Sequence, residues 1–286
     1  MAVTVYTLDS FVKDGRGGNP AGVVLDADGL SDARLLAIAR QVGFSETAFV
    51  HKSARAAYKM RFFTPTAEVD LCGHATVAAF ALLRGRGLID DGSFSMETAA
   101  GVLAIAVSHG LVYMHQPLPE YGDILDKTEL AAALAIAPHT SPAHLPAQIV
   151  STGLRDILLP VATPDALAAI RPNREAIIRL SQKHGVIGIH AFCPAAGPGA
   201  AARCRNFAPL YDIDEEAATG TSNGALACYL YKYGALEKAP QQDLVFDQGH
   251  SLGRPSEILA RLTAKNGAIC AVEVGGRALL RGQIAL

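Results

Sequence analysis

The sequence predicts an α+β protein made of two similar halves, each with a sheet rolled around one central helix. An internal repeat predicts the two halves: residues 61–88 read RFFTPTAEVDLCGHATVAAFALLRGRGL, and residues 205–235 read RNFAPLYDIDEEAATGTSNGALACYLYKYGA. Each copy contains a helical segment of small and apolar residues, and a helix that is apolar all round is expected to be buried.

The two copies match position by position. The matched pairs are Arg61 and Arg205, Phe63 and Phe207, Pro65 and Pro209, Gly73 and Gly220, and Gly87 and Gly234. The second copy carries three extra residues before its first matched glycine, and in both copies the next matched glycine follows 14 positions later. Spacing that agrees at both ends indicates one structural unit used twice.

The expected order within each half is strand, loop, helix, strand, and then loop, central helix and hairpin. Short segments rich in β-branched and aromatic residues predict the strands of the first half at 4–11, 21–26, 46–50, 59–64, 94–99 and 102–107. Helices that end at a glycine are predicted over 33–43 and 174–185. The central helices are predicted over 76–87 and 223–234, where apolar residues recur three and four positions apart.

The predicted boundaries are 1–116 for the first half and 117–278 for the second. Residues 279–286 are left open as a final strand that returns to the first half. The stretch 133–148 contains three prolines and has no strong period, so it is predicted to be the connection between the two halves.

Composition excludes several classes of function. Half of the 286 residues are hydrophobic and the net charge is −2, which provides a core and argues against a nucleic-acid partner. The N-terminus does not resemble a secretory signal, and no apolar run approaches the roughly 18 residues of a membrane span. Five scattered cysteines favour a reducing, cytoplasmic compartment, and the histidine and cysteine spacings predict no metal site.

The starts of the two central helices are the first candidate binding positions. They read Gly73, His74, Ala75 and Gly220, Thr221, Ser222. A helix N-terminus offers N–H groups that lack an intrahelical acceptor, together with a partial positive charge. A matched pair of such starts is expected to face a cleft between the halves and to bind a small carboxylate there.

Four motifs together resemble the phenazine-biosynthesis PhzF-like family. They are GNPAGVVLDA (18–27), FSETAFV (44–50), RFFTPTAEVDLCGHAT (61–76) and FAPLYDIDEEAATGTS (207–222). The resemblance implies the diaminopimelate epimerase-like fold, with the active site between two pseudo-symmetric halves. It also implies an isomerase without cofactor or metal, similar to the enzyme that moves a proton in trans-2,3-dihydro-3-hydroxyanthranilate. A small-molecule carboxylate is the expected partner, and a homodimer stays open.

The resemblance also assigns roles to residues. Glu46 is the expected acid/base, and its apolar neighbours favour a desolvated carboxyl group that takes up a proton and returns it. His74 and Glu216 are expected to be catalytic as well. The family pattern has aspartate and serine where this chain has Glu216 and Thr221, which affects the substrate more than the reaction. The expected substrate-binding residues are Ser45, Gly73, Ala75, Gly220, Thr221 and Ser222.

Two alternatives remain. An amino-acid racemase, epimerase or dehydratase of this fold would use two thiols, and Cys72 stands at one of the two helix starts. The other start has Ala217 and Ala218 where a second thiol is expected, which disfavours that mechanism. The chain could also be a non-catalytic protein that binds a small anion. The acidic residues Asp212, Asp214 and Glu215 are expected to form a solvated loop.

Overall fold

The computed structural model describes residues 2–137, 140–194, 199–236 and 243–286. The chain divides into two compact units. The first contains the residues up to His115 together with Gly275–Leu286, and the second contains Gln116–Val274. In the described part of the chain, no helix has the length and apolar character needed to cross a membrane.

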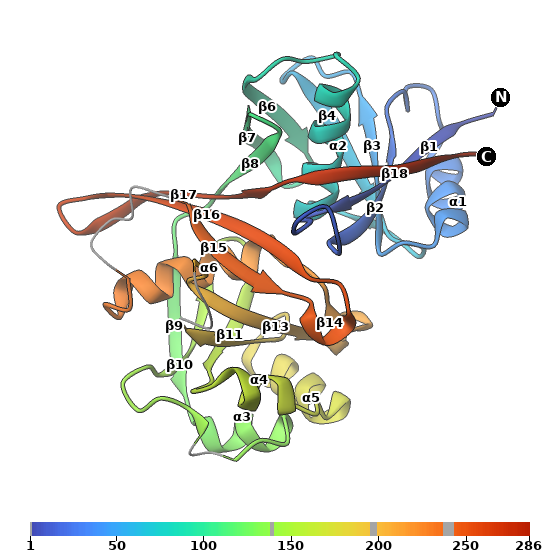
Figure 1. Ribbon diagram of the computed structural model, residues 1–286. Coiled ribbons are helices and arrows are strands. Elements are labelled where there is room, and N and C mark those ends of the chain that lie inside the picture. The colour runs from blue at the N-terminus through green and yellow to red at the C-terminus, as the bar shows by residue number, and fades with distance from the viewer. Residues whose placement is uncertain (1, 138–139, 195–198, 237–242) are drawn as a thin grey trace. The chain divides into compact units, whose positions relative to one another are not determined.

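The first unit is built from the N-terminal helices and strands of the chain together with its last strand (Figure 1). Its helices are α1 (Asp32–Val42) and α2 (Gly73–Gly85). Its strands are β1 (Thr4–Ser10), β2 (Asn19–Val24), β3 (Glu46–His51), β4 (Tyr58–Phe63), β5 (Glu68–Val69), β6 (Gly92–Thr98), β7 (Gly101–Ser108), β8 (Leu111–Gln116) and β18 (Ala278–Ala285).

The second unit has more helices. They are α3 (Lys127–Ala133), α4 (Pro164–Ala169), α5 (Arg174–His184), η2 (Pro209–Tyr211), α6 (Gly220–Lys232) and η3 (His250–Leu252). Its strands are β9 (Glu120–Leu125), β10 (Ala147–Ser151), β11 (Arg155–Pro160), β12 (Ile189–Pro194), β13 (Ala202–Ala208), β14 (Ile213–Glu216), β15 (Leu244–Gln248), β16 (Ser256–Lys265) and β17 (Ala268–Gly276). The prediction that 133–148 connects the two halves is wrong, because this stretch joins α3 to β10 inside the second unit. The chain passes from one unit to the other between His115 and Gln116 and again between Val274 and Gly275.

The strand order and polarity of the two units match over seven strands, from β18 to β7 in the first and from β9 to β16 in the second. In the first unit the sheet runs β18-β1-β2-β3-β4-β6-β7-β8, with β2 and β3 parallel and β4 and β6 parallel. In the second it runs β9-β10-β11-β12-β13-β15-β16, with the equivalent pairs β11–β12 and β13–β15 parallel. The predicted fold class, two similar α+β halves, is confirmed.

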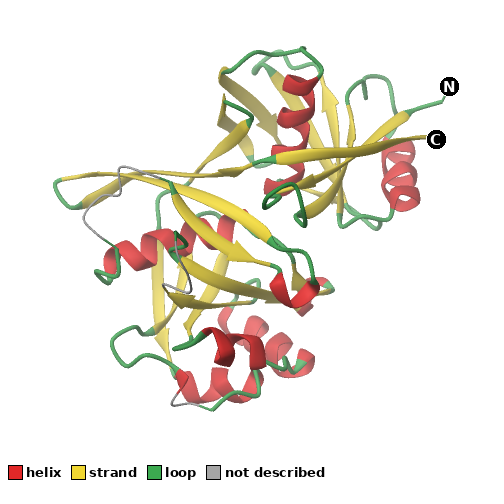
Figure 2. Cartoon of the chain, viewed as in Figure 1, coloured by secondary structure: helices red, strands yellow, loops and turns green. Residues whose placement is uncertain are grey.

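Each sheet is buried on two faces. In β12, the side chains of Ile189, Ala191 and Cys193 join a core with α3, α4 and α5, whereas His190 between them faces α6. Alternate residues of a strand point to opposite faces, so this strand is covered on both sides. The helices drawn red in Figure 2 agree, with α6 on one face of the sheet and α3, α4 and α5 on the other.

The central helices are buried as predicted. Nine of the 13 residues of α2 and ten of the 13 residues of α6 are buried. Both helices end two residues before the predicted glycine, and Gly87 and Gly234 each have a φ of 68°. A residue in the left-handed conformation at this position ends the helix, and glycine adopts that conformation without steric cost.

The matched arginines make matched contacts in their own units. Arg61 on β4 lies over the Phe63 ring at 5.1 Å, and Arg205 on β13 lies over the Phe207 ring at 5.0 Å. Arg61 donates both Nε and Nη2 to Glu68, and Arg205 donates both to Glu215. The repeat seen in sequence therefore extends to side-chain contacts.

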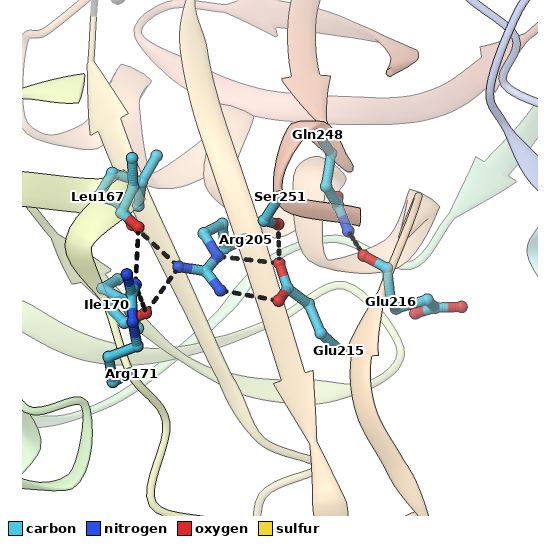
Figure 3. A network of polar contacts seen from close by, with 9 residues as sticks. Leu167, Ile170, Arg171, Arg205, Glu215, Glu216, Gln248 and Ser251 are labelled. Atoms are coloured by element: carbon cyan, nitrogen blue, oxygen red, sulfur yellow. Dashed lines mark hydrogen bonds and ion pairs between the residues drawn. The ribbon is translucent and has the colours of Figure 1, made fainter. Parts of the chain in front are cut away.

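One prediction about the acidic segment is wrong. Glu215 is not part of a solvated loop, because its side chain is 11% exposed and pairs with Arg205. Figure 3 shows the Arg205 guanidinium held between Glu215 and the carbonyl groups of Leu167 and Ile170. The neighbouring Asp212 and Asp214 are exposed, as expected, and pair with Arg174 on α5.

Candidate functional site

Glu46 and His74 come together in the first unit. Glu46 is the first residue of β3, directly after the turn that follows α1, and His74 is in the first turn of α2. Glu46 Oε2 is 3.3 Å from His74 Nε2. Oε2 is buried, and among the residues that the structure describes none makes an aligned hydrogen bond to it. This oxygen is therefore desolvated, with an imidazole beside it.

Polar groups surround the His74 ring on both edges. Asn19 Nδ2 and Cys72 Sγ are each 3.4 Å from Nδ1, and Ser45 Oγ is 3.5 Å from Nε2. The Ser10 hydroxyl donates to the His74 carbonyl at 2.6 Å. These contacts come from β1, β2, the start of β3 and the helix itself, so the ring is fixed by most of the elements around it.

The His74 ring is neutral at physiological pH. Burial lowers its pKa from 6.5, and the nearby Glu46 carboxylate and a hydrogen bond to the Pro20 backbone oppose that shift without cancelling it. A neutral imidazole has one donor nitrogen and one acceptor nitrogen. It can therefore support a neighbouring carboxyl group in either protonation state.

The other predicted residues of the first unit lie around this pair. Gly73 is partly exposed at the first helical position, and a Cβ there would meet only Met114 Cε, at 3.5 Å, within 4 Å. Ala75 is buried, so it can act through its backbone only. Ser45 is exposed next to Glu46. The sequence predicted this set, and the fold places it at one helix start.

In the second unit Glu216 lies at the start of α6. Thr219 Oγ1 donates to Glu216 Oε2 at 2.7 Å. Gln248 on β15 donates through Nε2 to the Glu216 carbonyl at 2.8 Å and to Thr219 Oγ1 at 3.0 Å, and its Oε1 accepts from the Thr219 N–H at 3.2 Å. Gln248 is fully buried, and its hydrogen bonds hold the first turn of α6 against the sheet.

A buried polar row continues from Gln248 across the sheet. Asn223 donates to Gln248 Oε1 at 2.9 Å, and its Oδ1 is 3.3 Å from His190 Nε2. Asn206 Nδ2 is 3.2 Å from both His190 Nδ1 and Ser222 Oγ. The Ser222 hydroxyl is buried and donates to Asp156, so its side chain serves this row and leaves only its backbone for a ligand.

Asp156 and His190 in this row have shifted pKa values. Burial raises the pKa of Asp156 to about 6, and hydrogen bonds from Ser222 and the Gly188 backbone limit that rise. Burial lowers the pKa of His190 to about 4, so it is neutral near pH 7. The row therefore has one group, Asp156, that changes charge close to physiological pH.

The three buried thiols of the second unit are poor candidates for a two-thiol mechanism. Burial raises the pKa of Cys193, raises that of Cys204 well above its usual range, and raises that of Cys228 to about 12. The Cys204 thiol donates to Asn223 Oδ1 at 3.3 Å, inside the polar row. Deprotonation of these groups, which a thiol base requires, is unfavourable.

Comparison with known families decides the relationship. Residues 8–282 match the family described as phenazine biosynthesis-like protein, PhzC-PhzF. The chain belongs to this family. The four motifs that resembled it in sequence thus identified it correctly.

Relatives of the phenazine biosynthesis-like family agree along the whole chain. An uncharacterized isomerase of Deinococcus radiodurans is 36% identical over 91% of this chain and 86% of its own. The trans-2,3-dihydro-3-hydroxyanthranilate isomerase of Pseudomonas chlororaphis is 33% identical over 96% of both chains. A crystal structure of a PhzF-family protein from Bacillus anthracis superposes with a TM-score of 0.91 at 30% identity, covering 100% and 99% of the two chains. The chain is an isomerase of this family.

Several residues around these groups were not predicted from the sequence. Asn19 and Ser10 contact His74, and Gln248, Asn223 and His190 support the start of α6. Asn19 lies inside the motif GNPAGVVLDA, which was a usable signal. The other members of the row are single polar residues on four different strands, and only the fold brings them together under α6.

Proposed function

We propose that this isomerase moves a proton between two carbon atoms of a small unsaturated carboxylate, with Glu46 as the only acid/base and without a cofactor. The observation that carries the proposal is the buried Glu46 Oε2, 3.3 Å from a neutral His74. The substrate named for the Pseudomonas chlororaphis relative, trans-2,3-dihydro-3-hydroxyanthranilate, is the first compound to test.

The reaction needs one group that acts in both directions. The Glu46 carboxylate takes the proton from a saturated ring carbon, and the electron pair of the broken C–H bond enters the conjugated system. The resulting carboxylic acid then gives a proton to another carbon of that system, which restores Glu46 as carboxylate. A carboxyl group can perform both steps, because it acts as a base when ionised and as an acid when protonated.

His74 is proposed to orient Glu46 and to hydrogen-bond the substrate. The N–H groups at the start of α2, from Gly73 to Ala75, are proposed to bind the substrate carboxylate, since a helix N-terminus favours an anion. For Glu216, Gly220, Thr221 and the Ser222 backbone, a role in substrate recognition at the start of α6 remains a proposal of the same kind.

The test follows the compound by NMR in heavy water with three proteins. Glu46→Gln keeps the shape of the side chain but cannot act as a base, so we expect turnover to fall by at least about a thousandfold. Glu97→Gln is the matched control: the Glu97 side chain is 17% exposed against 16% for Glu46, and its partners are Ser53 and Arg55. The control is expected to turn over at the parent rate.

Deuterium at the carbon that receives the proton shows whether the proton exchanged with solvent during the transfer. A proton that exchanges with solvent on Glu46 leaves deuterium in the product, and retained protium shows direct transfer. Equal turnover in Glu46→Gln and the parent protein would remove Glu46 from the mechanism. If the parent protein binds the compound but does not convert it, the compound is not its substrate, and other small unsaturated carboxylates are tested next.

A further inference from the structure

Proton transfer by Glu46 leaves Cys72 without a role, yet its thiol lies beside the acid/base. Glu46, Cys72 and His74 each offer one metal-ligating atom, and these atoms lie within 4.8 Å of one another. His74 Nε2 is 3.3 Å from Glu46 Oε2 and 3.9 Å from Cys72 Sγ. In a tetrahedral zinc site, Zn–S near 2.3 Å and Zn–N or Zn–O near 2.0–2.2 Å separate neighbouring ligand atoms by about 3.3–3.6 Å.

The spacing is therefore close to that of a cation site before any cation is bound. The distances from His74 Nε2 to Glu46 Oε2 and to Cys72 Sγ differ from these values by a few tenths of an ångström. The distance between the Glu46 and Cys72 ligand atoms must shorten by about 1 Å at most. Rotation of the Glu46 carboxylate about its side-chain bonds provides such a shift, since no described residue holds Oε2 in an aligned hydrogen bond.

The donor set selects the kind of cation. Thiolate, imidazole and carboxylate together favour a borderline-soft divalent ion such as Zn²⁺ over Mg²⁺ or Ca²⁺, which prefer oxygen ligands only. Two anionic ligands balance the charge of the ion, which matters here because Cys72 is 8% and His74 5% exposed.

The surroundings of His74 also suit a role of its ring as a metal ligand. A metal-bound imidazole usually donates its other N–H to a carboxylate, a backbone carbonyl or water, which fixes the ring. The Pro20 backbone hydrogen-bonds the His74 ring, and proline offers only its carbonyl for such a contact. Cys72 is the N-cap residue of α2, so its position relative to His74 is fixed by the helix start.

We propose that Glu46, Cys72 and His74 form a binding site for one Zn²⁺-like cation, and that the bound cation stops the isomerase reaction. Binding releases the thiol proton to solvent and forms bonds from the metal to sulfur, nitrogen and oxygen, leaving a fourth position for water. The second part of the proposal rests on the proposed function. A Glu46 oxygen bonded to the cation cannot accept a proton.

The first experiment measures the site without substrate. Metal-free protein is titrated with Co²⁺, which replaces Zn²⁺ and gives a thiolate-to-cobalt charge-transfer band. All proteins carry Cys270→Ser, because Cys270 is the exposed thiol. We expect one equivalent of Co²⁺ to produce the band, Zn²⁺ to displace it, and Cys72→Ala to lose it. No band in the folded Cys270→Ser protein, or a band that persists in Cys72→Ala, would overturn the site.

A second variant covers the case in which Cys72→Ala does not fold. Glu46→Gln keeps the thiol and the size of the side chain, and we expect at least tenfold weaker Co²⁺ binding. Glu97→Gln, as the matched control, should bind like the parent protein. Equal affinity in all three proteins would contradict the assignment of Glu46 as a ligand.

Inhibition is tested separately. Zn²⁺ is expected to stop turnover by the Cys270→Ser protein, a chelator is expected to restore it, and the inhibiting concentration should rise at least tenfold in Cys72→Ala relative to that variant's own metal-free rate. Cobalt binding with turnover unaffected by Zn²⁺ would refute the inhibitory part. Because the titration uses no substrate, it decides the site even if no compound is turned over.

Discussion

Asp156 is a buried carboxyl group whose charge changes close to neutral pH. It accepts hydrogen bonds from Ser222 and the Gly188 backbone, and His190 in the same row is neutral above about pH 4. Its pKa is raised from 3.8 to about 6, so the folded protein binds this proton more tightly than the unfolded chain. The free energy of unfolding therefore falls as the pH rises from 3.8 to about 6, by at most about 3 kcal/mol.

Asp156→Asn should remove this loss. We expect the urea midpoint of the parent protein to be lower at pH 8 than at pH 5 in part because of Asp156, and the variant to be more stable than the parent at pH 8 but not at pH 4. Asp123→Asn, at an exposed position, serves as the control. A variant with the parent's pH dependence would show that Asp156 does not titrate in this range.

The matched arginines differ in how deeply their ion pairs are buried. Arg205 and Glu215 are 10% and 11% exposed, whereas Arg61 and Glu68 are 21% and 37% exposed. Removing one partner of a buried pair leaves a desolvated charge, so Arg205→Met should cost about 3–5 kcal/mol of unfolding free energy. Arg61→Met should cost about 1 kcal/mol, because water compensates its partner.

Urea denaturation of the two variants measures this difference directly. The double variant Arg205→Met with Glu215→Gln should recover part of the loss, since it leaves no unpaired charge. Equal losses for Arg61→Met and Arg205→Met would contradict the account, because they would show that the stacking on phenylalanine, which both share, outweighs the ion pairs.

At the level of elements, α6 is fixed to its sheet by a buried glutamine near each end. Gln248 holds the first turn, and Gln148 on β10 accepts from Tyr233 just after the last turn, at 2.9 Å. Each replacement by methionine leaves buried polar groups without their hydrogen bond, which costs about 1–3 kcal/mol. The two variants should therefore be destabilised similarly.

Only one of them should affect the reaction. Gln248 positions Glu216 and Thr219, whereas Gln148 lies at the other end of the helix, so Gln248→Met is expected to lower kcat/KM at least tenfold and Gln148→Met to leave it unchanged. Stopped assays below the unfolding temperature of both variants separate activity from stability. Equal activity would make Gln248 a structural residue only.

The sequence predicted the elements better than the contacts between them. Glycines and apolar periodicity are local, so the central helices could be found from adjacent residues, whereas Glu46 and His74 were assigned through motifs that resemble a family. The polar row could not, because Asp156, His190 and Gln248 lie on three strands far apart in the chain. Glu215 was misassigned for the same reason: its charge indicates solvent, and only the pairing of β13 and β14 places it beside Arg205.

At the level of the whole chain, the C-terminal strand closes the N-terminal unit. β18 pairs antiparallel with β1 from Thr4 opposite Ala285 to Ser10 opposite Ala278, and Figure 1 shows the two strands side by side. Arg281 also pairs with Asp9 at 2.7 Å. Most of β18 is exposed, so its sequence has none of the alternation that reveals a strand, and only its pairing explains its position.

Removing residues 278–286 should therefore destabilise the first unit selectively. Without β18, the outer backbone groups of β1 lose their hydrogen bonds and form an open sheet edge. We expect amide exchange in β1 to accelerate at least a hundredfold, about 3 kcal/mol, while β10 in the second unit keeps its protection. A synthetic peptide of residues 277–286 should restore protection by adding the missing strand. Unchanged exchange in β1 would show that β18 does not contribute to the stability of the first unit.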